Sequence, residues 1–226
     1  QVGVYYLLYF PDEYRFQFNA HNLVVYGKDG DNYLISDPVM EQVTTLTEKQ
    51  LEKVRFAKGA FAPKGHIYYP TSFPEKLELE SAIIKGIKQT CREMTAPFPI
   101  VGANGVKTIA KLIRKWPKKK GAKVANHYLG QIVRMQEEIG TGGGGFRYIY
   151  AAFLQEASQV IGNDKLKELS KEMTQIGDNW RDFAVNASRI YKNRSAQDDA
   201  YNKVADELEA IGNSEAAFFK KLKKAI

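Results

Sequence analysis

The chain has 226 residues, of which 44% are hydrophobic and 26% are charged, and it carries a formal net charge of +7 and a single cysteine. One cysteine excludes an intrachain disulfide, and no apolar run approaches the ~18 residues of a membrane-spanning helix. We therefore expect a soluble, cytoplasmic protein with one large or two small domains. The basic balance is compatible with an acidic partner, whereas no recognisable module indicates nucleic acid and nothing indicates a membrane.

The first stretch is apolar nearly throughout. Val2–Phe10 is interpreted as a buried strand, which Pro11–Glu13 breaks before a polar-aromatic connection reaches His21. The chain opens on Gln1 and enters this strand at once, whereas a natural start usually has some lead-in. We therefore expect the polypeptide to be the C-terminal part of a longer protein.

Residues 21–38 predict a β-hairpin with a histidine at one end and an aspartate at the other. Two runs rich in β-branched and aromatic residues, Asn22–Gly27 and Asp31–Ser36, flank the loop Lys28–Gly30. A three-residue loop favours glycine at its last position, because that position needs a positive φ. In this register His21 lies directly opposite Asp37. Their shared face also carries four apolar side chains, namely Leu23, Val25, Tyr33 and Ile35.

A histidine beside a carboxylate has two interpretations. In the first, the carboxylate of Asp37 accepts one ring N–H of His21, fixes its tautomer and leaves the other nitrogen free as a general base. In the second, the pair is purely structural. The contact itself depends on the register, since a slip of one residue would put the two side chains on opposite faces.

The pattern changes to helix after Asp37-Pro38. Thr47–Gln50 has the sequence of a capping box, and Gly59 is expected to end the helix that follows. Residues 66–74 are expected to be extended, and Pro74 suits the first turn of the next helix. We therefore predict two domains, residues 1–73 and residues 74–226, the second with about six helices.

Apolar residues recur at helical spacing along the second domain. They place the only cysteine, Cys91, on a buried stripe near a helix C-terminus, where a thiol is inert. A long helix through Leu166–Phe183 is expected to be interrupted near Gly177-Asp178. Two further stripes are predicted to face the core: Val124, Tyr128, Ile132, Met135 and Ile139, then Phe146, Ile149, Tyr150, Phe153, Leu154 and Ala157.

A glycine-rich run precedes one of these helices. Glycines before a helix N-terminus leave free N–H groups, and Arg147 adds a positive charge, so an anion could bind there. The alternative is a flexible connector or a place where backbones pack closely. The candidate anion-binding residues are Gly142, Gly143, Gly144, Gly145 and Arg147. No cluster has metal-ligand spacing, so neither a metal nor another cofactor is expected.

Two motifs, in this order, resemble the butirosin-biosynthesis acyltransferase family, in which a papain-like domain precedes a helical one. The first comprises Val2–Leu7, His21–Gly27 and Leu34–Pro38, and the second is Thr141–Ala157. The resemblance implies an α+β chain, formed by the β-rich C-terminal half of a papain-like domain and a mainly helical domain. It also implies a Cys-His-Asp site with His21 as the base and Asp37 as its orienter.

This chain departs from the family at the nucleophile. In the family the nucleophilic cysteine lies well upstream of the histidine, but the residues before His21 contain no cysteine. The resemblance implies transfer of an acyl group from the thioester of an acyl carrier protein to a small amine, by a cysteine that this chain lacks. The alternatives are a catalytically inactive binding domain and a papain-like peptidase or amidase.

Overall fold

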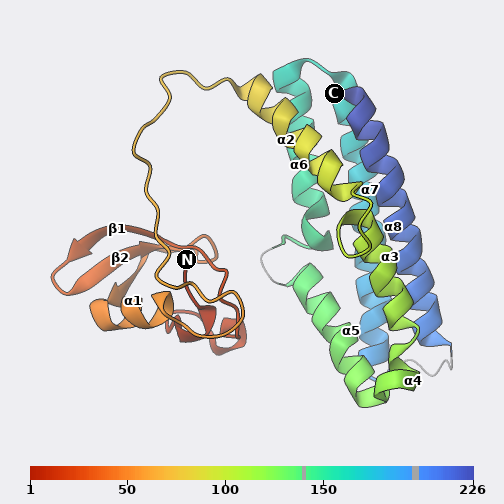
Figure 1. Cartoon of the computed structure of the whole chain (residues 1–226), viewed down its shortest axis with the longest axis horizontal. Helices are drawn as coiled ribbons and strands as arrows, with labels where there is room; N and C mark the ends of the chain where they lie inside the picture. The colour runs from red at the N-terminus through yellow and green to blue at the C-terminus, as the bar shows by residue number, and fades with distance from the viewer. Residues whose placement is uncertain (139–140, 195–198) are drawn as a thin grey trace. The chain divides into compact units, whose positions relative to one another are not determined.

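A computed structural model describes residues 1–138, 141–194 and 199–226 (Figure 1). The chain forms two compact units, Gln1–Glu75 and Lys76–Ile226. Unit 1 holds a small antiparallel sheet and one α-helix, whereas unit 2 is helical. The fold is therefore α+β with a helix-rich C-terminal part, as the sequence predicts.

Unit 1 is built around a three-stranded antiparallel sheet whose central strand is β2. Its core is a cluster of apolar side chains from the N-terminal segment, the sheet and helix α1. The elements of this unit are η1 (Val4–Tyr6), η2 (Asp12–Tyr14), β1 (Val24–Asp29), β2 (Asn32–Ser36), β3 (Thr44–Thr47) and α1 (Glu48–Arg55).

The predicted strand at Val2–Phe10 is wrong. Val2 alone pairs, in a single antiparallel bridge with His21, and the chain then winds through the 3₁₀ turn η1. The amide of Leu7 donates to Val4 O and that of Phe10 to Leu7 O, each at 3.0 Å. A 3₁₀ helix has three residues per turn, so apolar side chains three positions apart share one buried face. Because Val2–Phe10 is apolar nearly throughout, its sequence did not show which positions share the buried face.

The predicted register of the hairpin is also wrong. Asp29 pairs with Asn32, so the loop has two residues, and Gly30 at its first position has a φ of 55°. A tight two-residue loop of this kind places glycine first because its backbone there needs a positive φ. A bulge between Val25 and Gly27 then shifts the pairing by one residue. Val25 pairs with the buried Ile35 but is itself 39% exposed, so it is not part of the core as predicted.

Helix α1 follows a strand that the sequence pattern did not reveal. Thr47 ends β3 and also caps α1: its hydroxyl accepts from Gln50 N at 3.3 Å, while Gln50 Oε1 accepts from Thr47 N at 2.9 Å. The predicted capping box is therefore confirmed. The helix ends at Arg55, earlier than the predicted stop at Gly59.

Unit 2 is a bundle in which the long helices α7 and α8 pack along each other (Figure 1). Helices α5 and α6 contact α7, and α2 and α3 contact α8. Among the described helices, none combines the length and apolar character needed to cross a membrane. The elements are α2 (Leu79–Met94), α3 (Gly102–Ile113), α4 (Trp116–Lys120), α5 (Ala122–Glu137), η3 (Gly144–Phe146), α6 (Arg147–Ile161), α7 (Asp164–Tyr191) and α8 (Ala200–Ala225). Pro74 was expected in the first turn of a helix, but it precedes α2 and is not part of it.

The core face of α5 differs from the predicted stripe by about one position. The buried residues are Ala125, Leu129, Val133 and Gln136, whereas Tyr128 and Met135 are 40% and 65% exposed. A Cβ at Gly130 would lie 3.5 Å from the ring of Tyr191 on α7, so the two helices approach closely there. Leu129 and Val133, rather than the larger Tyr128 and Met135, are thus the apolar side chains buried in the core. The remaining predicted position, Ile139, lies outside the described residues.

Helix α7 is continuous, so the predicted interruption near Gly177-Asp178 is wrong. A Cβ on Gly177 would lie 2.8 Å from the ring of Tyr148, which shows that glycine is needed for close packing and not for a break. Phe146 and Ile149 were expected in the core but are both more than half exposed.

Candidate active site

The first residues of the chain fix the position of His21 through a backbone hydrogen bond and a ring contact. Val2 N donates to His21 O at 2.8 Å, and the ring of Phe10 meets the His21 ring edge-on at 5.6 Å between centroids. Two residues earlier, the buried Asn19 donates through Nδ2 to Lys58 O and Ala60 O. The loop that carries His21 is therefore anchored to the loop after α1.

Asp37 follows directly after β2 and its side chain is fully buried. Its Oδ2 lies 2.7 Å from His21 Nε2 and accepts from the Tyr9 hydroxyl, also at 2.7 Å. Its Oδ1 accepts from Val39 N at 2.9 Å. Asp37 therefore has three hydrogen-bond partners inside unit 1, and the His21 side chain beside it is 12% exposed.

The contacts determine the charge state of Asp37. Burial raises the pKa of its carboxyl, but the hydrogen bonds with His21, Val39 and Tyr9 outweigh burial and bring the pKa below its ordinary value. Burial, and then the hydrogen bond and charge of Asp37, raise the pKa of Tyr9, so its phenol stays protonated and donates. An ionised Asp37 can only accept a hydrogen bond, so Nε2 of a neutral His21 carries the ring proton and donates it. The lone pair is then on Nδ1. Nδ1 is the nitrogen available as a base.

The structure thus brings His21 and Asp37 into contact, but not in the way predicted. His21 precedes β1 and pairs with Val2, and it is not the cross-strand partner of Asp37 in the hairpin. The last pair of the hairpin is Val24 with Ser36, and beyond it the side chains of His21 and Asp37 still meet, at 2.7 Å. That this pair is catalytic remains a prediction.

Two residues of this cluster, Tyr9 and Val39, were not predicted from the sequence. The Asp37-Pro38 dipeptide was a usable signal for Val39, because an aspartate before proline often starts a turn and accepts the N–H two residues on. Tyr9 carried no such signal. Its hydroxyl reaches Asp37 across 28 positions of the chain, from a segment that was expected to be a strand.

The predicted anion site in unit 2 is occupied by groups of the protein itself. Gly144 N donates to Glu137 Oε1 and Gly143 N donates to the Thr141 hydroxyl, each at 3.2 Å. Gly142, Gly143, Gly144 and Gly145 all have positive φ. A Cβ at Gly144 would lie 3.3 Å from the backbone oxygen of Gly177 on α7, which favours the second alternative, a place where backbones pack closely.

Arg147, the other member of the predicted anion site, is paired inside the bundle. Its Nη2 lies 2.6 Å from Oε1 of Glu215, a fully buried residue of α8, and its guanidinium stacks over the Trp180 ring at 4.8 Å. Trp180 Nε1 also donates to Glu215 Oε1, at 2.7 Å. The positive charge of Arg147 is therefore compensated by a carboxylate of this chain, and an anion-binding role for the loop remains a prediction.

The only cysteine lies in the helical unit. Cys91 is buried near the end of α2, as predicted. Burial raises the pKa of its thiol, and the charge of Lys223 offsets this only in part. A buried thiol with a raised pKa is a weak nucleophile. Within the described ranges, no three His, Cys, Asp or Glu side chains are grouped so that they could hold a metal ion.

Fold and site together define an α+β protein in which a buried His–Asp pair in a small β unit precedes a helical unit. The chain belongs to the family described as "Domain of unknown function (DUF4872)", whose model matches residues 49–222. A second model, "Butirosin biosynthesis protein H, N-terminal", matches residues 1–38 and supports a relation to that protein. The second match contains both His21 and Asp37. None of the curated proteins compared with the chain matches it.

Proposed function

We propose that unit 1 carries the His–Asp half of a papain-like Cys-His-Asp site for acyl transfer. His21 is the base and Asp37 its orienter. The observation that carries the proposal is the 2.7 Å contact between His21 Nε2 and a carboxylate that Tyr9 and Val39 also hold. A base must keep one tautomer and one orientation, and this arrangement restricts both.

The nucleophile of this reaction is a cysteine outside residues 1–226. Cys91 does not fit the role, because it is buried in the other unit and its pKa is raised. His21 Nδ1 takes the proton of the external thiol, and the thiolate attacks the carbonyl carbon of an acyl thioester. The donor thiol leaves with a proton, and an acyl-enzyme remains. An amine then attacks the acyl-enzyme, giving an amide and restoring the thiol.

The relation to butirosin biosynthesis protein H supports an acyl carrier protein as the donor and a small amine as the acceptor. Carrier proteins of this kind are acidic, and the net charge of +7 is compatible with such a partner. A catalytically inactive binding domain is the second candidate. It is favoured by the absence of a reactive cysteine from the described residues.

Intact-mass spectrometry after incubation with an acyl thioester tests the proposal. The 226-residue chain should gain no mass, whereas a polypeptide extended upstream to include a cysteine-bearing segment should gain one acyl group. His21→Ala in the extended form should abolish the adduct, because the members of such a site act together. His127→Ala, at an exposed histidine of unit 2, is the matched control and should leave the adduct unchanged.

Three outcomes would change the assignment. An adduct on the 226-residue chain that disappears in His21→Ala would show that the nucleophile lies within the chain. No adduct on either form would favour the inactive binding domain. Rapid release of the free acid without an amine would instead favour a peptidase or amidase.

A further inference from the structure

The positive charge of the chain is concentrated in one segment of the helical unit. Of the 33 lysines and arginines, nine lie in residues 94–136, which contain no aspartate or glutamate. The other 24 are spread over the rest of the chain together with all 26 aspartates and glutamates. The segment therefore accounts for the whole net charge of +7, and it comprises α3, α4 and all but the last residue of α5.

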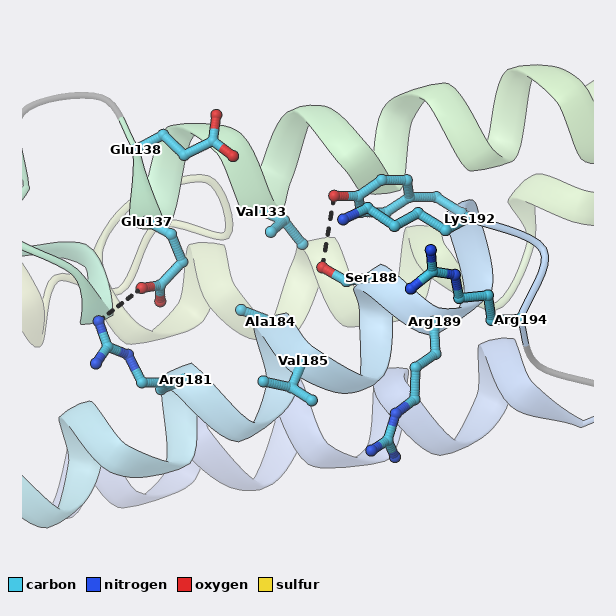
Figure 2. A pocket seen from close by; sticks show the side chains of 11 residues that line it. Val133, Glu137, Glu138, Arg181, Ala184, Val185, Ser188, Arg189, Lys192 and Arg194 are labelled. Atoms are coloured by element: carbon cyan, nitrogen blue, oxygen red, sulfur yellow. Dashed lines mark hydrogen bonds and ion pairs between the residues drawn. The ribbon is translucent and has the colours of Figure 1, made fainter.

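Most of these cations lie at one end of the bundle, around the short helix α4 (Figure 1). Gly121, with a φ of 77°, turns the chain from α4 directly into α5. The end of α7 reaches the same place, because Asn126 Nδ2 donates to Asn193 Oδ1 at 3.1 Å. Figure 2 shows Lys192 and Arg194 together at this end of α7. We call the following exposed side chains the basic end: Lys111, Lys115, Lys118, Lys119, Lys120, Lys123, Lys192 and Arg194.

The described carboxylates do not compensate the basic end. Among the ranges that the structure describes, none of its eight cations takes part in an ion pair. The carboxylates that α8 brings beside α3 are those of Asp206 and Glu209, and both bind Arg114 instead. Asp199, at the start of α8, adds one further negative charge. A clear surplus of positive charge therefore faces solvent at this end.

An apolar stripe crosses the basic end. Leu112 of α3 and Trp116 of α4 are four residues apart, and Val124 and Tyr128 are one turn apart on α5. The two pairs meet where the ring of Trp116 packs edge-on against that of Tyr128, at 5.4 Å between centroids. Leu112, Val124 and Tyr128 are 42%, 37% and 40% exposed, so the stripe is open to solvent. A lysine directly precedes three of these four residues in the sequence.

We propose that the basic end binds the surface of an anionic lipid bilayer. Clusters of roughly four to eight lysines or arginines beside apolar side chains are typical of such surfaces. The lysines lie among the lipid headgroups, and Leu112, Val124 and Tyr128 enter the boundary between headgroups and acyl chains. Tryptophan and tyrosine are the aromatic residues enriched at that boundary, and lysine stems can cover apolar surface while their charges stay in water.

Two other polyanions fit the basic end less well. Seven of its eight cations are lysines, whereas arginine is the residue suited to two-point recognition of nucleic acid phosphates. Lysine is also depleted in protein–protein interfaces relative to the rest of the surface. A surface contact of this kind needs no membrane-spanning helix. The proposal concerns unit 2 and shares no residue with the His21–Asp37 site, so either one can fail without the other.

Sedimentation of the 226-residue chain with lipid vesicles tests the proposal. One set of vesicles is phosphatidylcholine alone, and the other contains about 30% phosphatidylserine. At about 0.15 M salt, the chain should partition at least tenfold more strongly onto the vesicles with phosphatidylserine, since each lysine near such a surface contributes roughly a fivefold factor. Raising the salt to about 0.5 M should remove most of the difference, because exposed charges are then screened.

Removing charge from α4 and the start of α5 should remove the preference for anionic lipid. Lys118→Gln/Lys119→Gln/Lys120→Gln/Lys123→Gln should lower partitioning onto the anionic vesicles at least tenfold. Lysine-to-arginine changes at the same four positions keep the charge and should keep the binding. Leu112→Ser should weaken binding to the anionic vesicles at every salt concentration, because it removes apolar contact and no charge.

The matched control makes the same charge change at four exposed lysines near the opposite end of the bundle. These positions lie about 30 Å or more along α7 and α8 from the basic end, so the control should keep at least half of the partitioning. The control is Lys165→Gln/Lys167→Gln/Lys171→Gln/Lys220→Gln.

Three results would overturn the proposal. One is the same partitioning, or none, onto neutral and anionic vesicles, which would mean that the lysines do not bind lipid. Another is an equal loss in the control variant, which would mean that net charge, not the basic end, is responsible. The third is tighter binding to a double-stranded oligonucleotide than to the anionic vesicles, lost in the same lysine variant, which would assign the basic end to nucleic acid.

Discussion

Replacing Tyr9 by phenylalanine removes one of the three hydrogen bonds that Asp37 makes and leaves the aromatic ring in place. Because Asp37 is buried and ionised, the lost bond is of the charge-assisted kind, worth about 1.5–3 kcal/mol. His21 and Val39 still satisfy both carboxylate oxygens. We therefore expect the lower end of that range, about 1.5 kcal/mol, or about a tenfold rise in the equilibrium constant for opening of unit 1.

The effect of Tyr9→Phe depends on pH. In the folded protein the pKa of Asp37 lies below its ordinary value of 3.8, so the stabilisation is fully present above that value. It is lost as the pH falls through the folded pKa, because the carboxylate then becomes protonated. The variant should therefore be most destabilising at neutral pH, and the destabilisation should shrink below about pH 4.

The assay must report on unit 1 alone. Both tryptophans, Trp116 and Trp180, lie in the helical unit, so tryptophan fluorescence does not detect unfolding of unit 1. A urea titration followed by the amide NMR signals of residues 21–38 at pH 7 and pH 3 does. Tyr5→Phe is the matched control in the same unit, because Tyr5 is exposed, and it should change the unfolding free energy by about 0.5 kcal/mol or less.

Two results would refute this reasoning. If Tyr9→Phe cost no more than Tyr5→Phe at pH 7, the phenol would not be supporting Asp37. If the cost did not shrink as the pH was lowered through the folded pKa of Asp37, the lost interaction would not involve an ionised carboxylate.

Three further predictions concern packing and the buried groups. Gly3→Ala should destabilise unit 1 by about 1–3 kcal/mol in the same NMR titration, because its Cβ would lie 2.4 Å from Ala57 Cβ. Cys91 should react with a thiol reagent only as fast as unit 2 opens, and Cys91→Ala should leave any acyl transfer unchanged. Glu215→Gln should destabilise unit 2 by about 3–5 kcal/mol, measured by tryptophan fluorescence in urea, because it leaves Arg147 without its carboxylate.

Each of these has a control or a contradicting result. Gly86→Ala meets no atom within 4 Å and should be neutral or slightly stabilising, so an equal loss there would argue against the clash at Gly3. Labelling of Cys91 within seconds in the native protein would contradict its burial. Glu172→Gln breaks an exposed pair with Lys221 and should cost at most about 1 kcal/mol. A similar loss for Glu215→Gln would mean that the buried pair is not important for stability.

The sequence alone determined the features that depend on near neighbours in the chain. The capping box of Thr47 and Gln50 involves residues three apart, and Cys91 on a buried stripe follows from helical spacing. A positive φ at Gly30 follows from the turn chemistry of glycine. Each of these rests on short-range geometry that any isolated segment would share. The fold class, in contrast, was expected from the resemblance of two motifs to a known family.

Only the tertiary structure decided the features that depend on distant residues. The hairpin register includes a bulge, and the hydrogen bond from Tyr9 to Asp37 joins residues 28 positions apart. Helix α5 buries Ala125, Leu129 and Val133 in the core instead of the stripe that its apolar residues predict.

The contrast is clearest for the two charged pairs. A histidine and an aspartate in one hairpin-like stretch could be expected to meet, and His21 and Asp37 do so although the register differs. Arg147 and Glu215 are 68 positions apart, and nothing local indicates that they form a pair. Local chemistry can suggest a site, but the carboxylate that compensates a distant cation is chosen by packing between helices far apart in the chain.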